Sequence, residues 1–131
     1  MSNNVAIAAI IEHNGMVLVG KKITTEHVLS GAWHIPGGKV QFGETEEEAL
    51  IREMKEEANI NIRVEKFIDE RFVPEANIKV KWYLCFPLTR NIKPGDDLAE
   101  VKFVPKGEIL RICDPKAVFL WPPKVTEYFK S

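Results

Sequence analysis

The segment from Gly37 to Ile60, GGKVQFGETEEEALIREMKEEANI, constrains this chain more than any other part of its sequence. Two glycines precede a stretch from Thr45 to Ala58 in which no residue breaks a helix. Thr45 can cap the start of that helix, and Glu48, three residues later, can complete a capping box. The pattern therefore predicts a helix over 45–58 that begins shortly after a glycine bend.

Acidic side chains gather on one face of this predicted helix. Because residues three or four apart are neighbours on a helix, Glu53, Glu56 and Glu57 share a face. A solvated acidic surface is the alternative interpretation, but like charges at this spacing repel one another. Magnesium binds carboxylate oxygens and keeps several waters, which leaves positions for substrate phosphates. The acidic face is therefore a candidate Mg²⁺ site, and Mn²⁺ is a second candidate ion.

The glycines add a further constraint, since a backbone without side chains can bend sharply and approach a ligand or a metal. A glycine pair alone means little, but here it stands at fixed offsets from Glu44, Arg52 and the three glutamates. The segment resembles the signature of the Nudix hydrolases, G-x5-E-x7-R-E-U-x-E-E-x-G-U with U a bulky aliphatic residue. The matching positions are Gly38, Glu44, Arg52, Glu53, Met54, Glu56, Glu57, Asn59 and Ile60.

Two of these positions depart from the signature. Met54 stands where Ile, Leu or Val is usual, and its unbranched apolar side chain can fill the same buried slot. Asn59 replaces the last glycine, which would end the helix in the left-handed conformation. Asparagine is the next most tolerant residue there, so we expect the same cap at a slightly higher cost.

The resemblance implies an Mg²⁺-dependent hydrolase in which water attacks a phosphoanhydride of a nucleoside diphosphate linked to another group. Substrates of this class include nucleoside triphosphates, damaged ones among them, and nucleotide sugars such as ADP-ribose. Divalent ions would neutralise the phosphate charge while a carboxylate takes the proton of the water. The alternative is a non-catalytic Nudix domain that binds a nucleotide and regulates a partner, although such domains usually lose motif carboxylates.

By the same resemblance, four residues are expected to hold the metal: Gly38 through its carbonyl, Glu53, Glu56 and Glu57. Arg52 is expected to orient a motif glutamate through a fork-like contact, and Glu44 to belong to that supporting network. Glu53 is the first choice for the general base, because family members recruit the base either from the motif helix or from a later loop.

Residues outside the motif are weaker candidates. Glu100, just before the strand-like VKFV, is the candidate for an extra metal ligand or base, with an exposed strand-end glutamate as the alternative. Asp96 and Asp97 follow Pro-Gly, where aspartate usually serves the turn. Lys21 and Lys22, at the end of a predicted hairpin, can meet a phosphate, although most such lysines are solvated.

Substrate recognition is the least determined part of the site. The aromatic residues that can stack on a base are Trp33, Phe72, Trp82 and Trp121, although an aromatic residue in a strand more often belongs to the core. His34 lies just before the glycine bend and can reach a phosphate or a base. An ordinary packed or exposed histidine is the alternative.

The remaining sequence predicts strands on either side of the helix and short helices near the end. A hairpin around Asn14-Gly15 opens the chain, two β-rich segments flank PEAN, and LAEVKFVP forms another strand. GEILRI and KVTEYFKS favour late helices, the second behind Pro122-Pro123. This order predicts an α/β fold with a mixed β-sheet covered on both faces. The resemblance implies the Nudix three-layer α/β/α sandwich, with the motif helix on one face.

Length and charge bound the remaining possibilities. The 131 residues, 45% of them hydrophobic, suit a single Nudix domain over 1–131. A net charge of -1 provides no positive field for polymeric nucleic acid or an anionic membrane.

The apolar run 5–11 resembles neither a signal peptide nor a membrane span, so we expect the protein in the cytoplasm. Cys85 and Cys113 are expected to be buried free thiols. The expected partner is a nucleotide; some family members dimerise, so a homodimer stays open.

Overall fold

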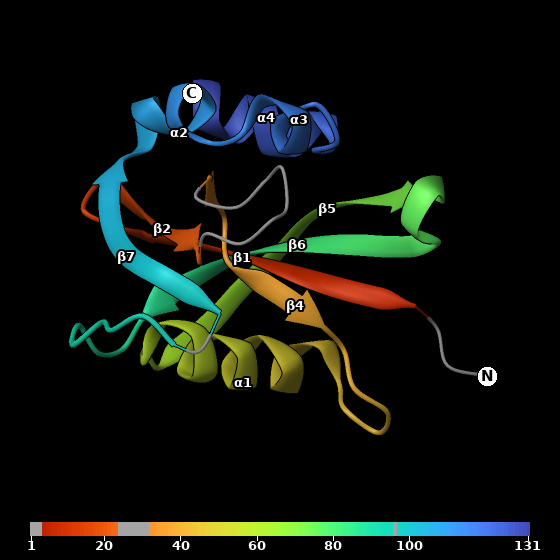
Figure 1. Cartoon of the computed structure of the whole chain (residues 1–131), viewed down its shortest axis with the longest axis horizontal. Coiled ribbons are helices and arrows are strands. Elements are labelled where there is room, and N and C mark those ends of the chain that lie inside the picture. Colours follow the sequence, from red (N-terminus) through yellow and green to blue (C-terminus); the bar gives the residue numbers. More distant parts are fainter. Residues whose placement is uncertain (1–3, 24–31, 96) are drawn as a thin grey trace.

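The computed structural model describes residues 4–23, 32–95 and 97–131. A twisted sheet runs through the middle of the molecule, with one long helix below it and short helices above it (Figure 1). The strands are β1 (Val5–His13), β2 (Met16–Lys22), β3 (Trp33–His34), β4 (Gly37–Lys39), β5 (Ile62–Val73), β6 (Ile78–Pro87) and β7 (Leu98–Pro105). The helices are α1 (Glu46–Ala58), α2 (Ile109–Ile112), α3 (Pro115–Val118) and α4 (Pro123–Lys130), with 3-10 turns η1 (Pro74–Ala76) and η2 (Lys106–Glu108). The predicted mixed α/β fold is confirmed.

The sheet places the glycine bend near its centre. Its strand order is β3-β2-β1-β6-β5, and β4 pairs with β1 while β7 pairs with β2. β1 runs parallel to β6, whereas its pairings with β2 and β4 are antiparallel. β2 pairs with β1 only near the hairpin turn, where His13 is opposite Met16. β4 pairs with the N-terminal half of β1, where Ile7 is opposite Gly38. The glycine bend therefore occupies the space into which β1 and β2 diverge.

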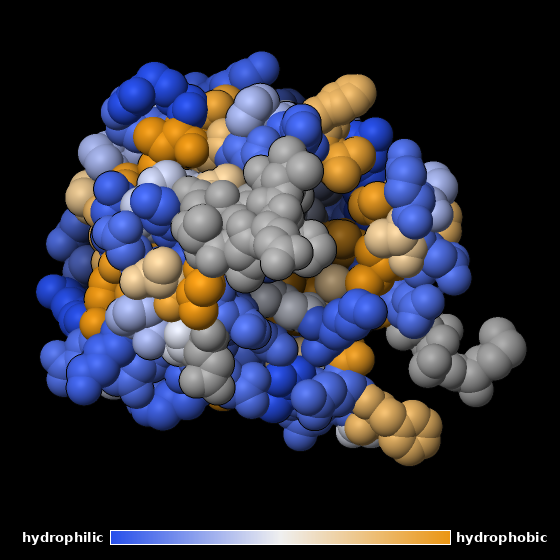
Figure 2. Space-filling model, viewed as in Figure 1, coloured by the Kyte–Doolittle hydropathy of each residue, from blue (hydrophilic) through white to orange (hydrophobic). Residues whose placement is uncertain are grey.

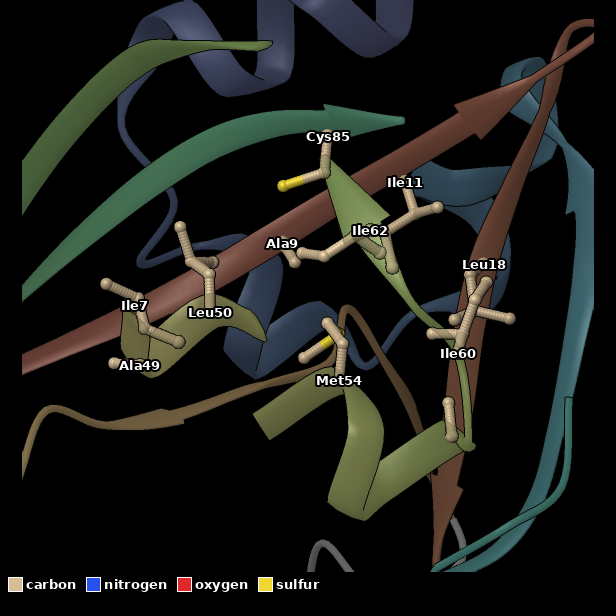
Figure 3. Packing of buried hydrophobic residues seen from close by; sticks show 11 residues of the cluster. Ile7, Ala9, Ile11, Leu18, Ala49, Leu50, Met54, Ile60, Ile62 and Cys85 are labelled. Atoms are coloured by element: carbon tan, nitrogen blue, oxygen red, sulfur yellow. The ribbon is translucent and has the colours of Figure 1, made fainter. Parts of the chain in front are cut away.

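Both faces of the sheet are buried, and β1 contributes to both. Ile7, Ala9 and Ile11 belong to a core cluster shared with α1, part of which Figure 3 shows from close by. The alternate residues Ala8 and Ile10 belong to a second cluster shared with the C-terminal helices. Because successive strand residues point to opposite faces, a strand buried on both sides reads as a continuous apolar run. This accounts for the sequence VAIAAII.

The motif helix has the predicted ends. Thr45 Oγ1 accepts from the Glu48 N–H at 3.1 Å, and Glu48 Oε1 accepts from the Thr45 N–H at 2.8 Å, which completes the capping box. Asn59 ends the helix in the left-handed conformation, with φ 54°. Met54 is fully buried against the sheet, as its slot in the motif requires. In Figure 2 the region where Figure 1 places α1 is predominantly hydrophilic. The side of α1 that lies opposite Met54 therefore faces solvent.

A polar anchor joins the start of α1 to the sheet. Lys81 Nζ donates to Glu46 Oε2 at 2.8 Å, and the Tyr83 hydroxyl donates to Glu46 Oε1. Lys81 and Tyr83 alternate with Trp82, which faces the other core. The first turn of the helix is thus fixed to β6, in addition to its apolar packing.

Two further expectations concern the cysteines and the membrane. Cys85 and Cys113 are buried free thiols, as predicted, and burial raises the pKa of each to about 12. Across the described ranges, every helix falls short of the length and apolarity needed to cross a bilayer.

Candidate active site

Arg52 organises the acidic residues of the motif. Its Nε and Nη2 donate to the two carboxylate oxygens of Glu44 at 2.6 and 3.0 Å, which is the predicted fork-like contact. Its Nη1 donates to Glu53 Oε1 at 2.9 Å and to Glu56 Oε1 at 3.0 Å. Nη2 also donates to the Lys39 carbonyl at 3.1 Å, so the arginine connects α1 to β4. One guanidinium therefore fixes three carboxylates relative to the glycine bend.

The electrostatics of this contact favour the charged forms. The hydrogen bond from Arg52 and the N–H of Gln41 lower the pKa of Glu44 to about 2. The hydrogen bond to Glu44 raises the pKa of Arg52 above its ordinary value. Glu44 thus remains ionised through the neutral range and belongs to the supporting network rather than to the cleft.

The glycine bend brings the backbone against two of the glutamates. The Gly37 N–H hydrogen-bonds the Glu57 carboxylate. Gly38 approaches Glu53 so closely that a Cβ at this position would overlap the Glu53 carboxyl group. A Cβ on Gly37 would overlap the Ile7 carbonyl oxygen on β1. Only glycine fits at both positions without displacing a neighbour. Because the backbone comes so close, it fixes the locations of Glu53 and Glu57.

These two carboxylates are poorly stabilised as anions in the protein alone. Burial, followed by the charge of Glu53, raises the pKa of Glu57 to about 7, against the opposing effects of Lys22 and the Gly37 N–H. Burial also raises the pKa of Glu53, although the hydrogen bond from Arg52 opposes it. A divalent cation would offset both the lost hydration and the mutual repulsion. The two side chains therefore supply hard oxygen donors in a setting that suits Mg²⁺ or Mn²⁺.

The described part of the chain does not form a closed cage of metal ligands. Within the ranges that the structure describes, no group of three His, Cys, Asp or Glu side chains is arranged to hold a metal ion. Magnesium usually takes one or two protein carboxylates and fills its other positions with waters and substrate phosphates. Glu56, with 59% of its side chain exposed, can turn toward such an ion. The assignment of Gly38, Glu53, Glu56 and Glu57 to metal fits the geometry and stays a prediction.

A cleft of about 260 Å³ lies where β1 and β2 diverge, and it is lined both by Glu57 of α1 and by Trp82 and Trp121 of the second core. Lys22 and Glu57 line its polar part. Its apolar walls include Ile35, Val80 and Leu98. Such a combination of apolar walls and a few convergent charged groups is typical of a small-molecule site.

The aromatic candidates divide between this cleft and other places. Trp82 lines the cleft together with Trp121 and His34. Trp82 is only 5% exposed and its ring lies edge-on to that of Trp121, with 5.1 Å between centroids. The two tryptophans therefore form a packed floor of the cleft.

Trp33 and Phe72 do not line this cleft. Trp33 is half-buried at the β3 edge, and Lys102 Nζ lies 4.5 Å from the centroid of its ring. Phe72 pairs across the strands with Lys79, which precedes the cleft residue Val80. Since neighbouring strand residues point to opposite faces, Phe72 lies on the α1 side of the sheet, where it is 51% exposed. Their assignment to the substrate gains no support from this cleft and stays a prediction.

Glu100 has the surroundings of the alternative interpretation, an exposed strand-end glutamate. The pairing of β2 with β7 shifts by one residue, so that Lys22 faces Leu98 and Lys21 faces Glu100. Because Lys21 and Lys22 point to opposite faces, this bulge turns Glu100 away from the cleft side that Leu98 lines. Glu100 is 58% exposed and lies 3.7 Å from Lys21 Nζ, as an exposed strand-end glutamate.

Among the described carboxylates outside the motif, Asp97 is close enough to influence Glu57. Its charge contributes to the raised pKa of Glu57. Asp96 lies outside the described residues. The aspartates of PGDD were weaker candidates than Glu100 because aspartate after Pro-Gly suits a turn. The cleft walls Ile35, Val80 and Leu98 were not predicted from the sequence. Ile35 and Leu98 directly follow the candidates His34 and Asp97, and Val80 lies two residues before Trp82 on the same strand face, so these positions were the signal that could have found them.

Comparisons with known proteins agree with this geometry. A family model described as the NUDIX domain matches residues 2–129. An ADP-ribose pyrophosphatase from Methanocaldococcus jannaschii is 28% identical over 131 residues, covering 96% of this chain and 73% of that protein. A CTP pyrophosphohydrolase from Escherichia coli is 36% identical over 62 residues, covering 47% of this chain and 45% of that protein. The matched segment spans less than half the length of several curated relatives.

The fold agrees with solved structures as well. A NUDIX hydrolase from Nitrosomonas europaea superimposes with a TM-score of 0.75 and 24% identity, covering 83% of this chain and 61% of that chain. The names of the relatives agree with the expectation of a hydrolase of nucleotide phosphoanhydrides. The family model matches nearly the whole length of this chain, and the motif carboxylates are grouped around one glycine bend. This chain therefore belongs to the NUDIX family.

Proposed function

We propose that this protein is an Mg²⁺-dependent pyrophosphohydrolase that cleaves a phosphoanhydride bond in a nucleoside diphosphate linked to another group. The observation that carries the proposal is the placement of Glu53 and Glu57 against the glycine bend, with Glu57 lining a cleft that has apolar walls. When bound, the metal neutralises phosphate charge and polarises the reacting bond. Glu53, Glu56 and Glu57, with the Gly38 carbonyl, would hold it.

The protein's own groups then have separate tasks. Arg52 holds Glu53 through Oε1, so that Oε2 is the oxygen that takes a proton from the attacking water. The water oxygen forms a bond to phosphorus as the bridging P–O bond breaks, and the leaving phosphate carries away the electron pair. Lys22, in the same cleft as Glu57, attracts the phosphates.

The substrate class rests on the cleft and on the relatives. The apolar walls formed by Ile35, Val80 and Leu98 suit a nucleobase, while the charged part suits phosphates. The matched relatives are named for ADP-ribose and CTP, so both nucleotide sugars and nucleoside triphosphates are candidate substrates. A regulatory, non-catalytic domain is less well supported because every motif carboxylate is retained.

The test is a hydrolysis panel. Phosphate, pyrophosphate and nucleoside monophosphate release would be measured from nucleoside triphosphates, 8-oxo-purine triphosphates, ADP-ribose, other nucleotide sugars and dinucleoside polyphosphates. Each assay is run with Mg²⁺, with Mn²⁺ and with a chelator. We expect metal-dependent turnover with a clear preference within the panel. Tight nucleotide binding without any turnover would instead support the regulatory alternative.

A further inference from the structure

A segment far from the motif in sequence closes the C-terminal end of α1. The Lys93 N–H donates to the Ala58 carbonyl at 3.0 Å, and the Gly95 N–H donates to the Glu57 carbonyl at 2.8 Å. The last carbonyls of a helix have no partner within the helix, so these bonds satisfy groups that would otherwise need water. We use the term strap for residues 91–95. The strap lies so close to α1 that a Cβ on Gly95 would overlap the Glu56 carbonyl oxygen.

Asn59 contacts this strap through its side chain. Its backbone forms the helix cap, with φ 54° and an N–H bond to the Lys55 carbonyl at 3.2 Å. A glycine would adopt this conformation at least as well. Its side chain does something that glycine cannot, because Nδ2 donates to the Asn91 carbonyl at 2.8 Å. The departure from the motif glycine therefore adds a bond from the motif helix to the strap.

The strap leads directly into the wall of the cleft. The Leu98 N–H donates to the Gly95 carbonyl at 3.3 Å, and the Leu98 side chain lines the cleft. The Asp97 carbonyl accepts from the Ile23 N–H at 3.3 Å, which joins the same segment to the end of β2. A change in the position of the strap would consequently move both Leu98 and the backbone of Asp97.

We propose that Asn59 is a positioning residue, whose side-chain amide holds the strap against α1 and thereby places Leu98 and Asp97 beside the glutamates. The catalytic consequence rests on the proposed function, whereas the tether itself does not. Asn59 touches no reacting atom in this role. It acts through Asn91 and the two backbone bonds from the strap to the helix.

The test compares Asn59→Gly with Asn77→Gly. Asn77 is the matched control, because it has φ 50° at the end of η1 and also accepts a left-handed conformation. In both variants glycine preserves the backbone conformation, so thermal unfolding should show a folded protein. Hydrogen exchange at Lys93 and Gly95, measured without metal or nucleotide, reports on the strap directly. A third variant, Asn59→Asp, keeps the shape of the side chain and places an acceptor opposite the Asn91 carbonyl.

We expect Asn59→Gly to speed exchange at these two amides by about two- to tenfold, the range of one hydrogen bond, and Asn77→Gly to leave it unchanged. Asn59→Asp should speed it further. With the preferred substrate, Asn59→Gly should lower kcat by a similar factor, with a smaller change in KM. Unchanged exchange in Asn59→Gly would overturn the tether. Faster exchange with unchanged kcat would overturn the positioning role. If the unmodified protein showed no turnover, the proposed function would be contradicted. The exchange result would still decide whether the tether exists.

Discussion

At the scale of single residues, the motif works through contacts between its own members. Arg52 reaches back to Glu44, which lies before the helix, and forward to Glu53 and Glu56. Glu44 is thus a supporting carboxylate, whereas Glu57 is the motif carboxylate that lines the cleft. The sequence allowed this division of roles to be anticipated because the offsets in the motif are fixed and arginine favours two-pronged contacts.

Replacing Glu44 with Gln tests the support. The lowered pKa of Glu44, about 2 against an ordinary 4.5, means that its charge stabilises the folded state above pH 4.5. This contribution should disappear as the pH falls from 4.5 toward 2. We therefore expect Glu44→Gln to be less stable than the unmodified protein at neutral pH, and the difference to shrink on acidification. Denaturant unfolding at a series of pH values measures it, and a difference that does not depend on pH would contradict the account.

Gly38→Ala tests the close approach to Glu53. Its Cβ would overlap the Glu53 carboxyl group, so either the glutamate or β4 must move. We expect most of the turnover to be lost while far-UV circular dichroism still shows a folded protein. Gly107→Ala is the control, because a Cβ at Gly107 meets nothing within 4 Å. Full activity in Gly38→Ala would show that the location of Glu53 is not critical.

At the scale of elements, the helices and strands follow from local patterns, but their exact pairing does not. The capping box and the left-handed asparagine define both ends of α1, and both are visible in the sequence. The bulge between β2 and β7 depends on contacts between distant strands. It decides which face Glu100 occupies, so the sequence could not choose between the two interpretations of that residue. The face that Phe72 occupies is likewise hidden in the sequence, because β5 contains two register shifts against β6 that local alternation does not reveal.

The capping box of α1 gives a prediction at this scale. Thr45→Ala removes the acceptor of the Glu48 N–H at the start of the helix. We expect the free energy of unfolding to fall by about 1 kcal/mol, the usual cost of losing such a cap. Chemical denaturation measures the change. Thr126→Ala is the comparison variant, because the Thr126 hydroxyl donates to the Pro123 carbonyl and caps no N–H in α1. An equal fall in the free energy of unfolding for Thr126→Ala would argue against a specific capping effect.

At the scale of the whole molecule, one sheet serves two cores. The α1 side positions the motif carboxylates, and the α4 side forms the floor of the cleft with Trp82 and Trp121. The layered α/β architecture could be predicted from the order of elements and from the resemblance to the family. The cleft could not, because it arises where β1 and β2 diverge around β4, and this depends on the assembled sheet.

The single domain over 1–131 remains a prediction with a direct test. Because β1 contributes side chains to both cores, neither core should unfold without the other. Tryptophan fluorescence reports mainly on the second core, which contains Trp82 and Trp121, whereas far-UV circular dichroism reports on all elements. We expect the two signals to give one coincident transition in denaturant. Two separated transitions would indicate independent units.

The most direct test of the central claim compares Glu57→Gln with Glu47→Gln in the metal-dependent hydrolysis of the preferred nucleotide. Glu57 lines the cleft beside the glycine bend, whereas Glu47 is exposed in the first turn of the same helix. We expect Glu57→Gln to remain folded and to lose at least about 100-fold in turnover, since even partners of metal ligands are worth 10–100-fold. Glu47→Gln should retain full activity. Undiminished Mg²⁺-dependent turnover in Glu57→Gln would contradict the assignment of this helix and cleft as the active site.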